Sequence, residues 1–343
     1  MKIIKKTNIH ASSNLLKFSF SKQYGFSLLE IFIALIIGLV ILMGVLSIFV
    51  GLRTTSNETS NYGELQENGR FAISVLSDDL LRQDFWGDYT GTISLANIHP
   101  VPSSPIGECI GGGVNNGTFP LADGHFRTLW GETVSSSSIL SGCRNDAKIN
   151  SDILQLKRAI STPLNLEAGN TAGTGRYYLI TNINNGAIFS PGTVPNIDNG
   201  RVWEYQHHIY YVREEVQGSN TVPVLMQGQL ANTFSFSPII DGIDIIRFEY
   251  GVDTDIDPTD TGYGTVNAYI PADNMTNALW DKASSRIIAV KIYVLARAIQ
   301  QDKKYENTNV YQLGSFTYTA NDNYRRLLFS STITLYNASI DVW

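Results

Sequence analysis

The feature that most constrains this chain is an apolar run near its start. From Phe26 to Leu52 there are 27 residues, and Glu30 is their single ionisable side chain. About 20 apolar residues suffice to span the hydrocarbon core of a bilayer as a helix. The 25 residues before the run contain five lysines and no acid, a bias that keeps this side in the cytoplasm and sends the rest across the membrane. A carboxylate in such a run is costly to bury, so Glu30 is expected to have a partner and a function.

The run differs from an ordinary secretory signal or signal anchor. A secretory signal has an apolar stretch of about 7–15 residues with a cleavage site after it, whereas here the one plausible processing site, Gly25-Phe26, precedes a longer run. The stretch GFSLLE at residues 25–30 resembles the processing motif of type IV prepilins. The resemblance implies cleavage after Gly25 by a prepilin peptidase, N-methylation of Phe26, and pairing of Glu30 with the terminal amine of a neighbouring subunit.

Charge and cysteine content limit the remaining function classes. The chain carries a formal charge of −6, and without the five leader lysines it has 20 basic against 31 acidic residues, so the mature chain is near −11. This acidic balance argues against nucleic acid as a partner. The two cysteines, Cys109 and Cys143, most simply form one disulfide in an oxidising periplasm, contributing about 3 kcal/mol; two free buried thiols are the alternative. A zinc site is disfavoured because no CxxC or HxxxH spacing accompanies them.

The sequence divides into five segments. Residues 1–25 are the predicted leader and 26–52 the transmembrane half of a long helix. Residues 53–86 form its amphipathic half, whose apolar stripe shares one helical face and consists of Leu65, Ala72, Ile73, Leu76 and Leu80. Charged residues, including Glu64, Asp78 and Asp79, are expected on the rest of that helix. Residues 87–150, rich in Gly, Ser, Asn and Pro, are predicted to be an irregular loop region that holds both cysteines.

Residues 151–343 are predicted to form an antiparallel β-sheet head. Strands with polar loops between them and no intervening helical pattern favour antiparallel pairing. The candidate strands are 153–160, 176–182, 207–212, 222–226, 243–252, 286–296 and 327–335. The fold class is therefore α+β: a pilin-like protein with a long N-terminal helix packed on an antiparallel sheet.

Two further segments resemble the minor pilin family PilW. They are QENGRFAISVLSDDLLRQDFWG at 66–87 and YRRLLFSSTITLYN at 324–337, and FEYGVDTDID at 248–257 is also similar to a family segment. The resemblance implies a structural minor pilin that helps to prime and assemble the type IV pilus, in a tip complex. Its implied partners are other minor pilins, the major pilin, the prepilin peptidase and the inner-membrane assembly platform. The implied location is the inner membrane, single-pass with a periplasmic head, and then the extracellular pilus.

Three alternatives stay open. A minor pseudopilin of a type II secretion system would share the N-terminal helix, although the segments at 66–87 and 324–337 favour the pilus. The head could instead be a pilus-tip adhesin, because loop regions such as 87–150 commonly carry binding function. A membrane-anchored enzyme has no support from the sequence, since GxSxG, P-loop and GxGxxG motifs are all missing from it.

One acidic segment is a candidate cofactor site, and no other cofactor is indicated. Alternate carboxylates in an irregular segment can converge on Ca²⁺, which takes about six to eight oxygen ligands; the candidates are Asp253, Asp255, Asp257 and Asp260. The alternative is a solvated acidic turn after the strand at 243–252. His207 and His208 are adjacent, so on a strand they point to opposite faces and cannot chelate one ion together.

Overall fold

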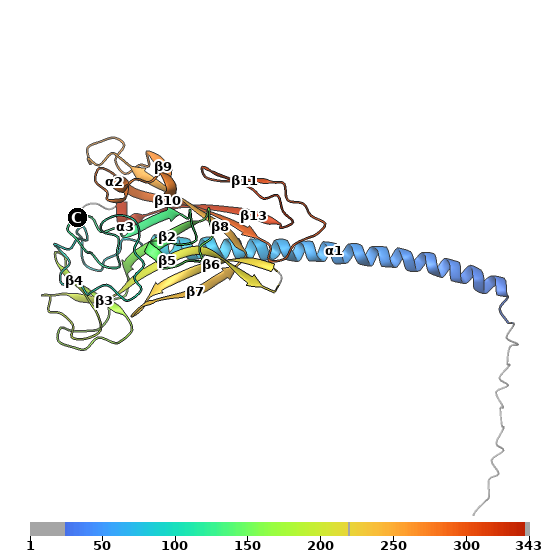
Figure 1. Ribbon diagram of the computed structural model, residues 1–343, viewed down its shortest axis with the longest axis horizontal. Coiled ribbons are helices and arrows are strands. Elements are labelled where there is room, and N and C mark those ends of the chain that lie inside the picture. Colours follow the sequence, from blue (N-terminus) through green and yellow to red (C-terminus); the bar gives the residue numbers. More distant parts are fainter. Residues whose placement is uncertain (1–24, 219, 340–343) are drawn as a thin grey trace, which may run out of the picture. The chain divides into compact units, whose positions relative to one another are not determined.

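The computed structural model describes residues 25–218 and 220–339. The chain forms two compact units, up to Glu58 and from Thr59 onward. Helix α1 (Leu28–Leu81) contributes to both units, and Figure 1 shows it in blue and cyan. The predicted leader, apart from Gly25, lies outside the described residues, as do the last four residues of the predicted head.

In the first unit, the described part of α1 exposes its apolar side chains. Phe26 is 82% exposed and Phe32 60%, and every side chain described from 25 to 53 is exposed. Among the described residues, α1 is the one helix long and apolar enough to cross a membrane. A helix that is apolar on all sides is stable when lipid or other apolar helices surround it.

In the second unit, the remaining turns of α1 belong to the head. Four side chains of its apolar stripe are at most 1% exposed: Leu65, Ala72, Leu76 and Leu80. They pack in one core with residues from the larger and the smaller sheet described below. The predicted stripe is therefore confirmed, with Ile73 half-buried at its margin. The helix ends at Leu81, and Asp84 shortly after it has a positive φ of 62°, so the chain turns away there.

The larger sheet has seven antiparallel strands arranged around one long strand. Strand β5 pairs with β2 along one edge; along the other it pairs with β3 near its start and with β6 near its end. Strands β1, β4 and β7 extend the sheet from β2, β3 and β6. The strands are β1 (Leu129–Thr133), β2 (Asp152–Ala159), β3 (Tyr177–Thr181), β4 (Gly186–Phe189), β5 (Arg201–Gln217), β6 (Asn220–Leu230) and β7 (Phe234–Asp241).

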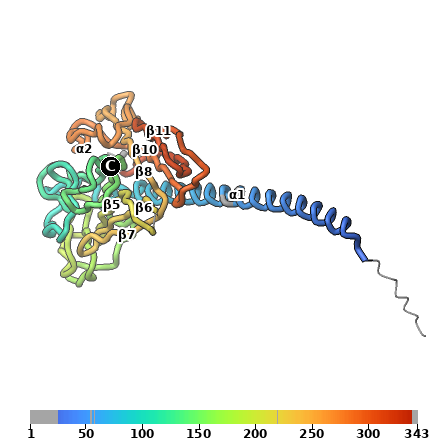
Figure 2. Tube along the Cα trace, turned by 45° about the vertical axis from the view of Figure 1, so that its right-hand side comes forward, coloured from blue at the N-terminus to red at the C-terminus, as the bar shows by residue number. Residues whose placement is uncertain are grey.

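The smaller sheet has four antiparallel strands in the order β13-β10-β8-β9. They are β8 (Ile243–Asp253), β9 (Ala268–Pro271), β10 (Arg286–Arg297) and β13 (Arg326–Thr334). A hairpin of β11 (Val310–Leu313) and β12 (Phe316–Thr319) covers one face of this sheet, where Leu313 packs with Ile245 and Leu295. Figures 1 and 2 both place β11 beside these strands.

Short helical turns complete the described chain: η1 (Leu140–Gly142), η2 (Ala272–Asn274), α2 (Asn277–Trp280) and α3 (Tyr336–Ser339). The predicted α+β class is confirmed, with an N-terminal helix, antiparallel sheets and one disulfide. All seven predicted strands occur, but β5 is much longer than the predicted 207–212. Six further strands were not predicted, and one of them, β1, lies within the segment 87–150 that was interpreted as irregular.

Candidate functional site: the N-terminal helix and its seat in the head

The residues with predicted processing and assembly roles lie at the first turn of α1. Gly25 and Phe26 precede the helix, which begins at Leu28. The backbone N–H of Ser27 donates to Oε2 of Glu30 at 3.1 Å. Ser27 and Glu30 have the Ser-x-x-Glu spacing of a capping box, in which the glutamate binds back to the first free amide. The charge in the apolar run therefore also caps the start of its own helix.

A buried aspartate fixes the last turns of α1 to the larger sheet. Asp79 is 4% exposed. Its carboxylate accepts hydrogen bonds from Arg158 Nε at 2.8 Å and from the Tyr210 hydroxyl at 2.8 Å, and it lies 2.6 Å from His208 Nδ1. Burial alone would raise the pKa of Asp79, but the neighbouring His208, with Arg158 and Tyr210, outweighs burial and lowers it. Asp79 is thus a charged pin between helix and sheet.

The expectation that Asp79 lies on the polar side of the helix was wrong. Asp79 follows Ala72 by seven residues and Leu76 by three, so it shares the buried face with them. Asp78, by contrast, is exposed and pairs with Arg82 at 2.8 Å. The helical offset was the signal that could have separated the two aspartates.

Close packing of α1 against the smaller sheet requires a glycine. Gly69 is buried, and a Cβ built there would lie 2.1 Å from the ring of Phe329 on β13. A residue that weakens a helix in isolation therefore lets the ring of Phe329 lie against the helix backbone.

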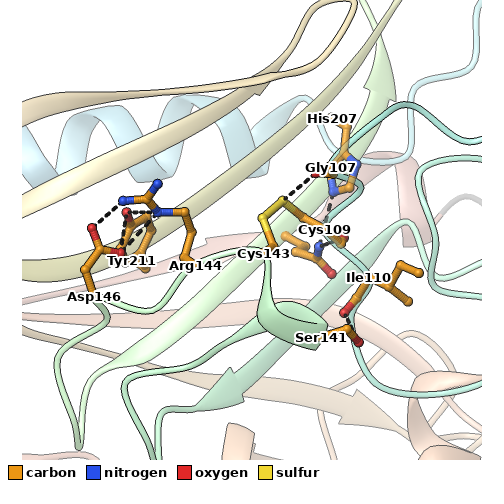
Figure 3. The surroundings of a disulfide bond; sticks show 10 residues. Gly107, Cys109, Ile110, Ser141, Cys143, Arg144, Asp146, His207 and Tyr211 are labelled. Carbon is orange, nitrogen blue, oxygen red and sulfur yellow. Dashed lines mark hydrogen bonds and ion pairs between the residues drawn. A yellow bond between two sulfur atoms is a disulfide. The ribbon is translucent and has the colours of Figure 1, made fainter.

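The two cysteines are joined in the structure. The disulfide links Cys109 to Cys143, whose Cα atoms are 5.1 Å apart, and Figure 3 shows its surroundings. Gln155 on β2 donates from Nε2 to the carbonyl oxygen of Cys109 at 3.0 Å, and the hydroxyl of Ser141 donates to the carbonyl oxygen of Ile110 at 3.3 Å. The disulfide thus lies against the larger sheet and ties two parts of the loop region together.

The adjacent histidines point to opposite faces, as predicted. His207 is fully buried, 3.3 Å from Gln155 through Nε2 and edge-on to the Phe234 ring. His208 faces Asp79 on the other side of β5. The pair therefore divides its contacts between the disulfide side of the sheet and the helix side.

The four aspartates of the predicted calcium site do not form a common site. Asp253 is fully buried, and its carboxylate accepts hydrogen bonds from Arg286 at 2.7 Å and from the backbone N–H of Gly264 at 2.9 Å. Asp257 accepts from the backbone N–H and the hydroxyl of Thr259. No cluster of three or more potential metal ligands occurs among the described side chains. The carboxylates of Asp253 and Asp257 are therefore engaged in an ion pair and a turn and do not converge on one point.

A cavity of about 760 Å³ lies just beyond the end of α1. Its lining includes Trp86, Tyr89, His125, Lys282 and Arg286. Burial and the nearby Lys282 lower the pKa of His125 to about 4, so this imidazole is neutral at physiological pH. The cavity combines aromatic surface with two cations that are each paired with a carboxylate, Lys282 with Asp84 and Arg286 with Asp253.

The comparison with known proteins identifies the C-terminal part of the head. Residues 209–337 match the family described as type IV pilus-assembly protein W. This part of the head is therefore similar to the PilW family. The match begins within β5, ends within α3, and includes Phe329, which packs against Gly69. It also contains two of the segments that resembled PilW, 248–257 and 324–337, whereas 66–87 and the N-terminal motif lie outside it. No curated protein and no solved structure matches the chain.

The matching family is described as a pilus-assembly protein family. The match relates this part of the head to the type IV pilus, and it suggests other pilus components as partners. The N-terminal apolar helix of the chain could anchor it in a membrane. Reasoning from sequence missed the structural roles of Asp79 and Gly69. These residues lie in the part of α1 that belongs to the second unit, where they contact the two sheets.

Proposed function

We propose that this protein is a minor pilin that takes part in priming and assembling the type IV pilus, in a tip complex with other minor pilins. The observation that carries the proposal is the combination of an exposed apolar helix with a PilW-family head. An assembly subunit needs a helix that rests in lipid before assembly and among other helices afterwards. The side chains of residues 26–52 suit both surroundings.

Assembly in this proposal begins with processing. A prepilin peptidase cleaves after Gly25 and methylates the new terminus at Phe26, on the cytoplasmic side of the inner membrane. The head lies in the periplasm and later in the extracellular pilus, most simply at its tip. The assembly platform extracts the helix, and the minor and major pilins are its neighbours.

Glu30 has two roles in this proposal. In the single chain its carboxylate accepts the Ser27 N–H. In the assembled fibre it neutralises the terminal amine of a neighbouring subunit, which would otherwise enter an apolar bundle uncompensated at a cost of several kcal/mol. The two roles are compatible, because a carboxylate has about four acceptor positions and the cap uses one.

The capping contact suggests variants that separate charge from cap. Glu30→Gln removes the charge but keeps a side chain that can cap a helix, whereas Glu30→Ala removes both. Glu64→Ala, at an exposed acidic position farther along α1, is the matched control. The measurement is the amount of each variant in sheared pili relative to the membrane fraction, alongside total surface pili.

We expect both Glu30 variants to insert and to be cleaved normally, because neither adds a charge and Gly25 is untouched. Incorporation and piliation should fall for both, while Glu64→Ala should match the wild type. Full incorporation of Glu30→Gln together with loss of Glu30→Ala would assign the defect to the cap and refute the charge-pairing mechanism.

A minor pseudopilin of a type II secretion system remains the nearest alternative. It would use the same helix and processing chemistry, and the PilW match is the observation that favours the pilus. Deleting the gene distinguishes them: loss of surface pili with normal protein secretion supports the proposal, and the reverse result refutes it.

The cavity beyond α1 favours a second candidate function, a pilus-tip adhesin. Aromatic side chains beside ion-paired polar groups in one cavity suit a polar ligand. Lys282→Ala alters this lining and should weaken attachment of sheared pili to a surface without changing the number of pili. Unchanged attachment would remove the cavity from consideration.

A further inference from the structure

A fully buried lysine lies in the head without a carboxylate partner. Lys157 on β2 is 0% exposed, and no ion pair joins it to a carboxylate of the described residues within 4.0 Å. Its Nζ donates to Oδ1 of Asn116 at 2.6 Å and to the carbonyl oxygen of Arg127 at 2.8 Å. Two acceptors match the two N–H bonds of a neutral amine. Burial shifts the pKa of Lys157 well below its ordinary value, which favours the neutral amine with its nucleophilic lone pair.

The Asn116 side chain is held in place on both sides. It is 1% exposed, and its Nδ2 donates to the carbonyl oxygen of Gly112 at 3.0 Å. Its Oδ1 atom accepts the hydrogen bond from the lysine. The lysine nitrogen is therefore close to Cγ, the amide carbon to which Oδ1 is bonded. Fixing two reacting groups at such a distance can raise the rate of their reaction by many orders of magnitude.

The surroundings contain a half-buried carboxylate, Glu108, and two buried aromatic side chains. The charge of Glu108 acts on Lys157, and the Oε1 atom of Glu108 accepts the backbone N–H of Thr118, two residues after Asn116. The ring of Phe126 lies 4.8 Å from the lysine nitrogen. The Tyr205 side chain, also buried, donates its hydroxyl proton to the carbonyl oxygen of Thr118. Burial of the reacting groups favours reaction of the amine with the amide, because less water is present to hydrolyse the amide instead.

We propose that Lys157 and Asn116 form an intramolecular isopeptide bond. The lone pair of the neutral lysine nitrogen attacks Cγ of Asn116, and a C–N bond forms. The C–N bond to Nδ2 then breaks, and one molecule of ammonia leaves. The proton lost by the attacking nitrogen passes to the departing one, and we assign its relay to Glu108, the carboxylate whose charge acts on Lys157 and which ends unchanged. No oxidant or other co-reactant is needed.

The bond would add a second covalent tie to the loop region. The disulfide holds residue 109 to residue 143, and the isopeptide bond would hold residue 116 to β2. The disulfide joins two parts of the loop region, whereas the isopeptide bond would fasten that region to the larger sheet and would persist under reducing conditions. The inference does not depend on the proposed pilus function, because it concerns the chemistry of the folded head alone.

Mass spectrometry of the full-length chain, purified from membranes and then reduced and denatured, tests the proposal. Its intact mass should be lower than the sequence mass by one ammonia, after allowance for processing at the N-terminus. Trypsin does not cleave after a linked lysine, so digestion should yield a branched peptide that joins 83–127 to 149–158. Lys148, which forms ion pairs with Asp244 and Glu214, is the internal control and should be cleaved normally.

Variants assign the reacting groups. Lys157→Met and Asn116→Ala should each restore the full mass and abolish the branched peptide. Glu108→Gln should leave the chain largely unlinked. A wild-type chain with the full mass and a linear 149–157 peptide would overturn the proposal whether or not the variants fold. A bond that forms equally well in Glu108→Gln would overturn the role given to that carboxylate.

Discussion

The seat of α1 in the head depends on the charge of Asp79, and replacing this residue by asparagine should cost much of the stability of the head. The carboxylate is 4% exposed and contacts Arg158, His208 and Tyr210 at 2.6 to 2.8 Å. Removing the charge leaves the guanidinium of Arg158 buried without a counter-charge, a change that costs about 3–5 kcal/mol. For a unit of this size that corresponds to a fall in melting temperature of about 10 °C.

Asp78 is the matched control, because its side chain is 58% exposed and its ion pair with Arg82 is open to solvent. Asp78→Asn should therefore change stability by less than about 1 kcal/mol. The assay is thermal and urea unfolding of the soluble head, residues 59–343, with each variant beside the wild type. Equal stability of the Asp78 and Asp79 variants would refute the assignment of Asp79 as the charged pin.

The pH dependence of this pin has a definite sign. The pKa of Asp79 is lowered in the folded head relative to the ordinary value of 3.8, so the unfolded chain binds the proton more readily. Its contribution to stability is complete above about pH 4 and is lost as the pH falls toward the folded pKa. The acid-induced loss of stability should be smaller in Asp79→Asn than in the wild type.

Two further changes test other parts of the head. Gly69→Ala should lower stability by about 1 kcal/mol, because the clash with the Phe329 ring outweighs the better helix propensity of alanine; in a Phe329→Ala background the same change should stabilise the head, and failure to reverse sign would contradict the packing argument. Between pH 6.5 and about 4 the unfolded chain protonates His125, whereas the folded head keeps it neutral. The free energy of unfolding should therefore decrease as the pH is lowered through this window. His125→Gln should flatten that slope, and an NMR titration that finds the His125 imidazolium at pH 6 would contradict the prediction.

Sequence reasoning predicted what depends on periodicity and missed what depends on tertiary contacts. The alternation in β10 and the stripe on α1 each reflect one buried face, so both could be predicted. Strand β7, with the sequence FSFSPIID, alternates too, but it was not among the predicted strands. Among the described strands β7 pairs with β6 alone, and an edge strand tolerates a proline such as the one in this sequence.

The candidate site divides in the same way. The roles of Gly25, Phe26 and Glu30 come from a local motif, and they remain predictions. The acidic residues after β8 looked like a cation site because their spacing is regular, but Arg286, more than twenty residues later, engages Asp253. The contact of Lys157 with Asn116 joins residues 41 positions apart, and no local pattern marks it. Long-range pairing of this kind could not be predicted without the fold.

The most direct test of the central claim is the chemical identity of the mature N-terminus in assembled pili. Pili are sheared from cells, and the N-terminal peptide of this protein is sequenced by mass spectrometry. The account predicts a chain that begins at Phe26 with one methyl group on its amine, and no such species from cells carrying Gly25→Val. A chain absent from sheared pili, or one whose N-terminus lies after Leu52, would contradict the account.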